Sequence, residues 1–118
     1  MEVNGMDCIF CKIANREIPS DIVYEDDYVA AFKDLDPQAP VHVLVVPKQH
    51  IASWNELTAQ DGELLSHIVL AVQEVAKITG IYESGYRVVN NCGVDGGQTV
   101  GHLHFHLLGG REMLWPAG

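Results

Sequence analysis

The segment His102–Leu108 alternates histidine with apolar residues, and this alternation constrains the fold more than any other part of the chain. Successive side chains of a β-strand point to opposite faces, so the pattern predicts a strand with three imidazoles on one face. Leu103, Phe105 and Leu107 would form the buried face. Because imidazole can act as a nucleophile, a proton carrier or a metal ligand near neutral pH, the segment predicts a reactive surface backed by a core.

The remainder of the chain predicts an α+β fold around this strand. Ile22–Glu25 and Tyr28–Phe32 are typical of a hairpin, and the β-rich run Val41–Val46 indicates a central strand. Tyr86–Asn90 indicates one further strand. Together with His102–Leu108 these segments make about five strands, which we expect to form one antiparallel sheet.

Two helices are expected beside the sheet. Apolar residues recur at helical spacing in one long helix that ends at Gly80: Leu64, Leu65, Ile68, Val69, Val72, Val75 and Ala76. A short N-terminal helix, capped by Asp7, would run through Cys11 and Ile13. No repeat or linker divides the sequence, so we expect a single domain over residues 1–118.

The charge and composition of the chain exclude some classes of binding partner. Seven basic and sixteen acidic residues give a net charge of −9, so the chain has no diffuse attraction for DNA, RNA or anionic lipid. Backbone donors can still hold the phosphate of a small ligand. No leader pattern opens the sequence and no apolar run approaches the ~20 residues of a membrane span. We therefore predict a cytoplasmic protein without nucleic-acid polymers or membranes as partners.

The residues alone leave three interpretations of the histidine run open. The histidines could be ordinary polar residues on the solvated face of an edge strand, they could hold a metal ion, or one could act as a nucleophile. The preceding loop favours the nucleophile, because Gly96 and Gly97 let backbone N–H groups approach an anion, while Gln98 and Thr99 add side-chain donors. His42, alone in an apolar strand, would join the same proton network if its strand lies beside the histidine strand.

Cys8 and Cys11 form a C-x-x-C pair with three possible interpretations. The pair could be a redox centre, half of a metal site, or two small buried residues. A redox motif is expected near a βαβ pattern, whereas this pair stands at the start of an α+β chain. A closed tetrahedral zinc site needs two further ligands, and His50 and His102 are the candidates.

His102–Leu108 also matches the H-φ-H-φ-H-φ-φ motif of the histidine triad superfamily, with φ apolar, and the chain resembles the Hint branch of that superfamily. The resemblance extends along nearly the whole chain, through Cys11–Ile13, Ile18–Pro19, Phe32–Val46, Pro47–Ile51, Asp95–Thr99, Leu107–Arg111 and Trp115–Gly118. It implies a HIT-like fold and a homodimer of α+β protomers. It also implies a nucleoside phosphoramidase or nucleotidyl hydrolase, that is, a hydrolase acting on purine nucleotide derivatives of the AMP type.

The resemblance further implies roles for particular residues. His104 is the middle histidine, which is the nucleophile in the family and forms a nucleotidyl-histidine intermediate. The remaining contacts would be made by Asp34 and Leu35 at the ribose and base, by Asn91, Gly97, Gln98, Thr99 and His106 at the phosphate, and by His42 in proton movement. Thr99 stands where relatives commonly have serine, so it keeps the hydroxyl proposed to protonate the leaving group and adds a methyl group.

The Cys8 and Cys11 pair, with His50 and His102, resembles the zinc site of some bacterial-type members and of galactose-1-phosphate uridylyltransferases. A structural zinc ion is therefore expected, separate from a chemical step that needs no metal. Two alternative functions remain open from the sequence. One is a zinc-dependent hydrolase with catalytic histidine ligands, and the other is a nucleotide-binding regulatory module with incidental turnover.

Overall fold

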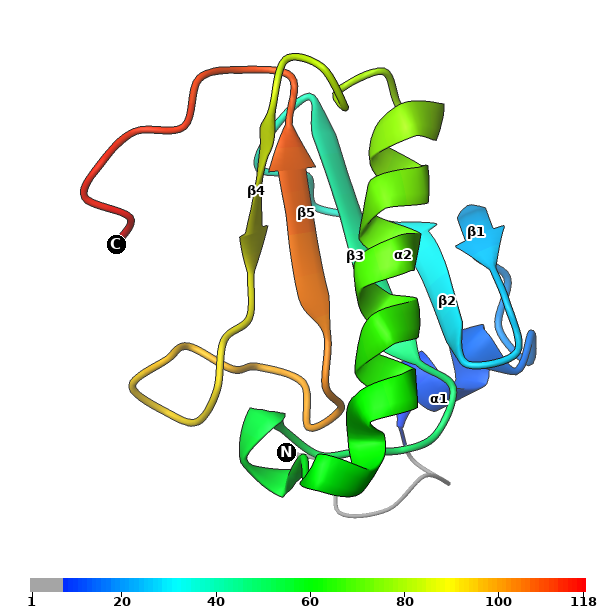
Figure 1. Ribbon diagram of the computed structural model, residues 1–118. Helices are drawn as coiled ribbons and strands as arrows, with labels where there is room; N and C mark the ends of the chain where they lie inside the picture. Colours follow the sequence, from blue (N-terminus) through cyan, green and yellow to red (C-terminus); the bar gives the residue numbers. More distant parts are fainter. Residues whose placement is uncertain (1–7) are drawn as a thin grey trace.

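The computed structural model describes residues 8–118, and Figure 1 shows how its elements are arranged. In chain order they are α1 (Ile9–Ala14), β1 (Ile22–Glu25), β2 (Val29–Lys33), β3 (Val41–Pro47), the 3₁₀ turns η1 (Trp54–Glu56) and η2 (Ala59–Asp61), α2 (Gly62–Ile78), β4 (Tyr86–Val89) and β5 (Phe105–Gly109). The predicted α+β class, the five strands and both helices are confirmed. Asp7, expected to cap α1, lies outside the described residues, and Cys8 occupies the N-cap position.

All five strands form one antiparallel sheet in the order β1-β2-β3-β5-β4. β3 lies at its centre, as its nearly continuous apolar sequence predicts for a strand buried on both faces. β5 lies beside β3, with Leu44 opposite His106 and His42 opposite Leu108. The strand that carries His42 is therefore the neighbour of the strand that carries His106, as a shared proton network requires.

The two faces of the sheet are covered by different helices. α2 lies across one face (Figure 1), where its buried residues pack against side chains that include Val45 and Leu107. α1 packs on the opposite face, against a second cluster that includes Leu44 and Val46. Because side chains alternate along a strand, His106 points away from α2 and shares the face of α1. The face without the long helix is thus the one that carries the histidines.

The boundaries of α2 follow from local chemistry. Thr58 and Asp61 form a capping box ahead of the helix, in which the N–H of Thr58 donates to Oδ2 of Asp61 at 2.8 Å. The helix ends at Ile78, and Gly80 follows with φ +78°, in the left-handed region that favours glycine. The predicted stop at Gly80 is confirmed. Within residues 8–118, no helix is long and apolar enough to cross a lipid bilayer.

The histidine strand is shorter than the sequence predicts. β5 begins at Phe105, so residues 102–104 precede the ladder of the sheet. Pro47 ends β3 and has no N–H with which to extend the ladder. The N–H of Leu103 donates instead to the carbonyl of Ile51, in the loop after β3, at 2.6 Å. The three histidines therefore do not share one regular strand, and each meets a different set of neighbours.

Candidate active site and metal cluster

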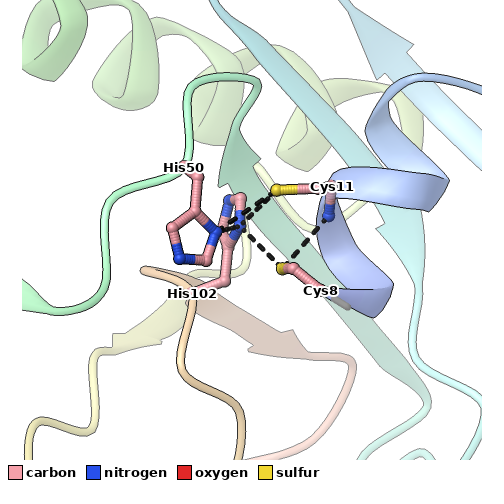
Figure 2. Close-up of side chains that lie close together, drawn as sticks. All are labelled: Cys8, Cys11, His50 and His102. Atoms are coloured by element: carbon pink, nitrogen blue, oxygen red, sulfur yellow. Dashed lines mark hydrogen bonds between the residues drawn. The ribbon is translucent and has the colours of Figure 1, made fainter. Parts of the chain in front are cut away.

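Two cysteines and two histidines from three separate segments lie together beside α1 (Figure 2). Cys8 and Cys11 come from the start of α1, His50 from the loop after β3, and His102 from the segment before β5. Sγ of Cys8 lies 3.1 Å from Nδ1 of His102, and Sγ of Cys11 lies 3.3 Å from Nδ1 of His50. The two Nδ1 atoms are 3.2 Å apart. The donor atoms of the four residues predicted as metal ligands therefore lie close together.

The donor atoms of this cluster fit a tetrahedral zinc ion. Zn–N and Zn–S bonds place the donors of such a site roughly 3.3–3.8 Å apart, close to the separations in this cluster. Nε2 of His102 lies 2.8 Å from the carbonyl oxygen of Pro47. A carbonyl can only accept, so the ring proton is on Nε2 and the lone pair of Nδ1 faces the cysteines. Two sulfur and two nitrogen donors form a common set for structural zinc.

The surroundings of Cys11 favour a metal ligand over a redox thiol. Burial raises the pKa of this thiol to about 12, with further contributions from Cys8 and from the charge of Glu17. A redox-active cysteine has instead a lowered pKa in an electropositive, partly exposed site. A bound cation would stabilise the thiolate that burial disfavours. The raised pKa thus argues against the redox interpretation, and the four converging donor atoms support the metal interpretation of the C-x-x-C pair.

His104 is buried, and the main chain sets the orientation of its ring. Nδ1 lies 2.7 Å from the carbonyl oxygen of His102, so Nδ1 carries the proton and Nε2 keeps the lone pair. Nδ2 of Asn90 donates to the carbonyl of His104 at 2.9 Å, and the ring of Phe10 packs edge-on at a centroid distance of 5.0 Å. Burial lowers the pKa of His104, and the carbonyl of His102 and the charge of Asp34 oppose this shift. A neutral imidazole with a free lone pair is the form that nucleophilic attack requires.

His106, His42 and Asp34 form a chain of polar contacts next to His104. The ring centroids of His104 and His106 are 5.1 Å apart. Nδ1 of His106 lies 2.9 Å from Nε2 of His42, which lies 3.4 Å from Oδ2 of Asp34. Burial, followed by the charges of His104 and His42, lowers the pKa of His106 to about 4, and Asp34 opposes the shift. His106 is therefore neutral at neutral pH, and the structure brings four of the predicted site residues together.

The loop between β4 and β5 is held by Gln98. Its Nε2 donates to the carbonyls of Ala52 at 2.8 Å and Val100 at 3.0 Å, and its Oε1 accepts from the N–H of Gly93 at 3.0 Å. Its backbone N–H donates to the carbonyl of Gly93. These contacts engage the donors of Gln98 within the protein. They give Gln98 a structural role, and its contact with phosphate stays a prediction.

The other predicted substrate contacts lie nearer the surface. Leu35, Gly97 and Thr99 are exposed, and Asn91 is half-buried. These positions are accessible to a ligand, and their contacts with base, ribose or phosphate stay predictions.

Two contacts of this site carry little signal in the sequence. The N–H of Gln38 donates to Nδ1 of His42 at 3.0 Å, and Asn90 supports the carbonyl of His104. Every residue except proline has a backbone N–H, so no residue type marks the role of Gln38. A polar side chain directly after a strand is the one signal that Asn90 offers.

An apolar cavity of about 790 Å³ lies between α2 and strands β4 and β5, on the face opposite the histidines. Its lining includes Val69 of α2 and Tyr86 and Val88 of β4, and we call it the α2–β4 groove. A smaller cavity of about 570 Å³ is lined in part by Asp34 and His42. No histidine is among the described residues that line the groove, so the groove is distinct from the histidine site.

Comparison with known proteins identifies the family. Residues 15–113 match the HIT domain family. The chain belongs to the HIT domain family. A HIT-like protein of Synechococcus elongatus is 59% identical over 95% of this chain and 97% of that protein. The purine nucleoside phosphoramidase of Escherichia coli is 48% identical over 89% of this chain and 88% of its own length.

A solved structure supports the same conclusion. The crystal structure of a HIT family hydrolase from Legionella pneumophila has a TM-score of 0.92 at 50% identity, covering 95% of this chain and 100% of that one. The predicted histidine triad membership and HIT-like fold are therefore confirmed. The relatives of this HIT protein include a hydrolase and a phosphoramidase, in agreement with the predicted class of activity.

Proposed function

We propose that this HIT protein is a nucleoside phosphoramidase or nucleotidyl hydrolase that cleaves the P–N or a related bond at the α-phosphate of purine nucleotide derivatives. The observation that carries the proposal is the tautomer of His104. Its Nδ1–H is tied to the carbonyl of His102, which leaves Nε2 as a free nucleophile in a buried ring. The 48% identity with the purine nucleoside phosphoramidase of Escherichia coli supports the substrate class.

In the proposed reaction, Nε2 of His104 attacks the α-phosphorus, so that a bond from nitrogen to phosphorus forms while the bond to the leaving amine breaks. The amine takes up a proton as it leaves, and the hydroxyl of Thr99 is the candidate donor. Water then attacks the phosphorus of the nucleotidyl-histidine: its oxygen bonds to phosphorus as the bond to His104 breaks, and one of its protons restores the hydroxyl of Thr99. The nucleotide is released and the imidazole is free again. His106 and backbone N–H groups of the β4–β5 loop would stabilise the charge on the phosphoryl oxygens. These steps need no metal.

The rest of the proposed substrate site follows from the family likeness. Asp34 and Leu35 would contact the ribose and base, and His42 would move protons. The phosphate would lie among Asn91, Gly97, Gln98, Thr99 and His106. The carboxylate of Asp34 lies 3.4 Å from Nε2 of His42, so the ribose would bind directly beside the proton network.

We infer that Cys8, Cys11, His50 and His102 hold a structural zinc ion. Four protein ligands close a tetrahedral site and leave no open position for water, which favours a structural ion over a zinc-dependent hydrolase. The ion would cross-link α1, the loop after β3 and the segment that leads to His104. It would thereby brace this segment without contacting the substrate.

We also propose that the chain forms a homodimer through the α2–β4 groove. β4 is an edge strand of the sheet, and apolar side chains are exposed at Val88 of this strand and at Val69 of α2. Antiparallel pairing of β4 with β4 of a second copy would continue the sheet across a two-fold axis and cover the groove.

Replacement of His104 tests the proposed activity. With adenosine 5′-phosphoramidate, His104→Ala should lower kcat by roughly a thousandfold or more, because the nucleophile is removed. Circular dichroism checks that the variant folds. His67→Gln, at a histidine of α2, is the matched control and should retain the wild-type rate. Mass spectrometry of the quenched wild-type reaction should show a nucleotidyl group on His104.

Each alternative function has a different outcome in these measurements. Wild-type turnover by His104→Ala would contradict the proposed nucleophile. A chelator that abolishes turnover, with no nucleotidyl-histidine in the quenched reaction, would support a zinc-dependent hydrolase. Tight AMP binding with negligible turnover of every nucleotide derivative would support the regulatory module.

A further inference from the structure

Both ring nitrogens of His42 have polar neighbours, and one neighbour decides where the ring proton lies. The N–H of Gln38 points at Nδ1 of His42 at 3.0 Å. A peptide N–H can only donate, so Nδ1 must hold a lone pair, and the proton of the neutral ring lies on Nε2. The side chain of His42 is buried, so this backbone contact is protected from competition by water.

The same reasoning extends to His106. Nε2–H of His42 faces Nδ1 of His106 at 2.9 Å and Oδ2 of Asp34 at 3.4 Å. The shorter contact makes Nδ1 of His106 the acceptor, so the proton of neutral His106 lies on its Nε2. Donation therefore runs in one direction, from Gln38 through His42 to His106.

The direction of these hydrogen bonds also distinguishes the cluster of Asp34, His42 and His106 from a metal site. The donor atoms of Asp34, His42 and His106 lie within 4.8 Å of one another, as metal ligands do. A metal on Nε2 of His42 would require the proton to move to Nδ1, where it would face the N–H of Gln38. The arrangement is therefore suited to hydrogen-bond donation and not to metal binding.

The turn that carries Gln38 is fastened to the end of β5. Nη2 of Arg111 donates to the carbonyl oxygen of Gln38 at 3.1 Å. Gly110 has φ +88°, and a Cβ at this position would lie 2.8 Å from Cβ of Pro40 in the same turn. The hydrogen bond from Arg111 therefore ties the turn to the end of β5, and the absence of a side chain at Gly110 lets the turn pack closely there.

Building on the proposed phosphoramidase function, we propose that the backbone N–H of Gln38, held by Arg111, is a positioning group for the reaction. It fixes the tautomers of His42 and His106, so that His106 offers Nε2–H as a donor to a phosphoryl oxygen. In the other tautomer, the lone pair of Nε2 would face that oxygen and repel it. Arg111 is accordingly a positioning residue that acts through Gln38.

Long-range ¹H–¹⁵N NMR of the wild-type protein tests this assignment directly, because it distinguishes protonated from unprotonated ring nitrogens. At neutral to slightly alkaline pH we expect a protonated Nε2 and an unprotonated Nδ1 in both His42 and His106. A protonated Nδ1 in either ring would overturn the proposal, and this result does not depend on the folding of any variant.

Two substitutions of Gln38 isolate the donor, because Gln38→Pro removes the N–H and Gln38→Ala keeps it. Gln38→Pro should give mixed tautomers in His42 and His106 and lower kcat for adenosine 5′-phosphoramidate about tenfold, with a smaller effect on KM. Gln38→Ala should retain the wild-type tautomers and kcat. A folded Gln38→Pro protein with unchanged tautomers and kcat would contradict the proposal.

Arg111→Gln tests the support of the turn. It should shift the tautomers in part and lower kcat about threefold, as expected for the loss of one exposed hydrogen bond. Arg16→Gln, at an exposed arginine that pairs with Glu25, is the matched control. Wild-type tautomers and kcat in Arg111→Gln would overturn the role of Arg111.

The measurements separate this inference from the proposed function. If the wild-type protein turns over the phosphoramidate but shows the opposite tautomers, only the positioning role of Gln38 is wrong. If it shows the expected tautomers but turns over no nucleotide phosphoramidate, the proposed function is wrong and so is the catalytic use of the hydrogen-bond chain.

Discussion

At the scale of single residues, the partner of one ring nitrogen decides what the other nitrogen can do. Nε2 of His102 faces a carbonyl, so its Nδ1 is available to the cysteines. In His104 the order is reversed, because Nδ1 faces a carbonyl and Nε2 is free. Two histidines that look equivalent in the sequence therefore have different reactive atoms.

The low pKa of His106 predicts a loss of stability in acid. Its pKa is about 4 in the folded protein, below the ordinary value of 6.5. The unfolded chain therefore binds this proton first, and the stability contributed by neutral His106 is present above pH ~6.5 and is lost as the pH falls toward ~4. His106→Gln should lose less unfolding free energy between neutral pH and pH ~5, as measured by urea denaturation. Equal losses in both proteins, at matched metal content, would contradict the prediction.

Replacement of His102 should remove the proposed zinc ion and lower the thermal stability of the protein. The wild-type protein, purified without added zinc, should contain about one zinc ion per chain by atomic emission analysis. His102→Ala should lose this zinc and melt at a lower temperature, because a buried ligand is removed. Cys92→Ala, at a cysteine outside the cluster, is the control and should keep the metal. A wild-type protein without metal, and with unchanged stability after chelation, would contradict the zinc site.

The sequence predicts residues whose side chains carry the chemistry, and it misses those that act through the backbone. The four cluster residues and the histidines are recognisable because cysteine and histidine are uncommon side chains with few roles. Gln38 contributes a peptide N–H, and Pro47 contributes a carbonyl. Such groups are present at almost every position, so only the folded chain shows which of them matter.

At the scale of elements, the predicted strands and helices agree with the structure, and the main difference lies at β5. Alternation of side chains indicates a strand but does not show where its hydrogen-bonded partner ends. The ladder stops because Pro47 cannot extend it. The beginning of β5 is thus decided by a residue more than fifty positions away in the sequence.

The conformation of the β4–β5 loop should depend on glycine at position 96. A Cβ at this position would lie 2.3 Å from the carbonyl oxygen of Cys92, so the loop must change conformation to accept alanine. Gly96→Ala should therefore weaken AMP binding about tenfold by isothermal titration, because the proposed phosphate contacts lie on this loop. Gly62→Ala, where a Cβ meets nothing within 4 Å, is the control and should bind AMP like the wild type. Wild-type affinity in Gly96→Ala would contradict the proposed role of the loop.

At the scale of the whole molecule, the sheet separates two surfaces. One face carries the histidines and α1, and the other carries α2 and the apolar groove. Sequence periodicity predicts which side of α2 is buried against the sheet, but it does not predict a groove formed by α2 and β4 together. That surface depends on how two elements distant in the chain are placed, which only the fold provides.

A pair of substitutions on α2 tests the proposed homodimer. Val69 and Ile78 are similarly exposed, at 55% and 58%, but only Val69 lines the α2–β4 groove. Val69→Lys should convert the dimer to a monomer in sedimentation equilibrium, because a charge would be buried at the interface. Ile78→Lys should leave the dimer intact. A wild-type monomer at micromolar concentration, or a dimer unaffected by Val69→Lys, would contradict this interface.

His102 contributes its ring to the cysteine cluster and its carbonyl oxygen to the nucleophile. Only the first contribution depends on the identity of the residue, because every amino acid has a carbonyl. A substitution of His102 therefore removes a donor of the cluster but keeps the carbonyl that holds the proton on Nδ1 of His104. His102 thus connects the two sites: its ring belongs to the cysteine cluster, and its main chain sets the tautomer of the proposed nucleophile.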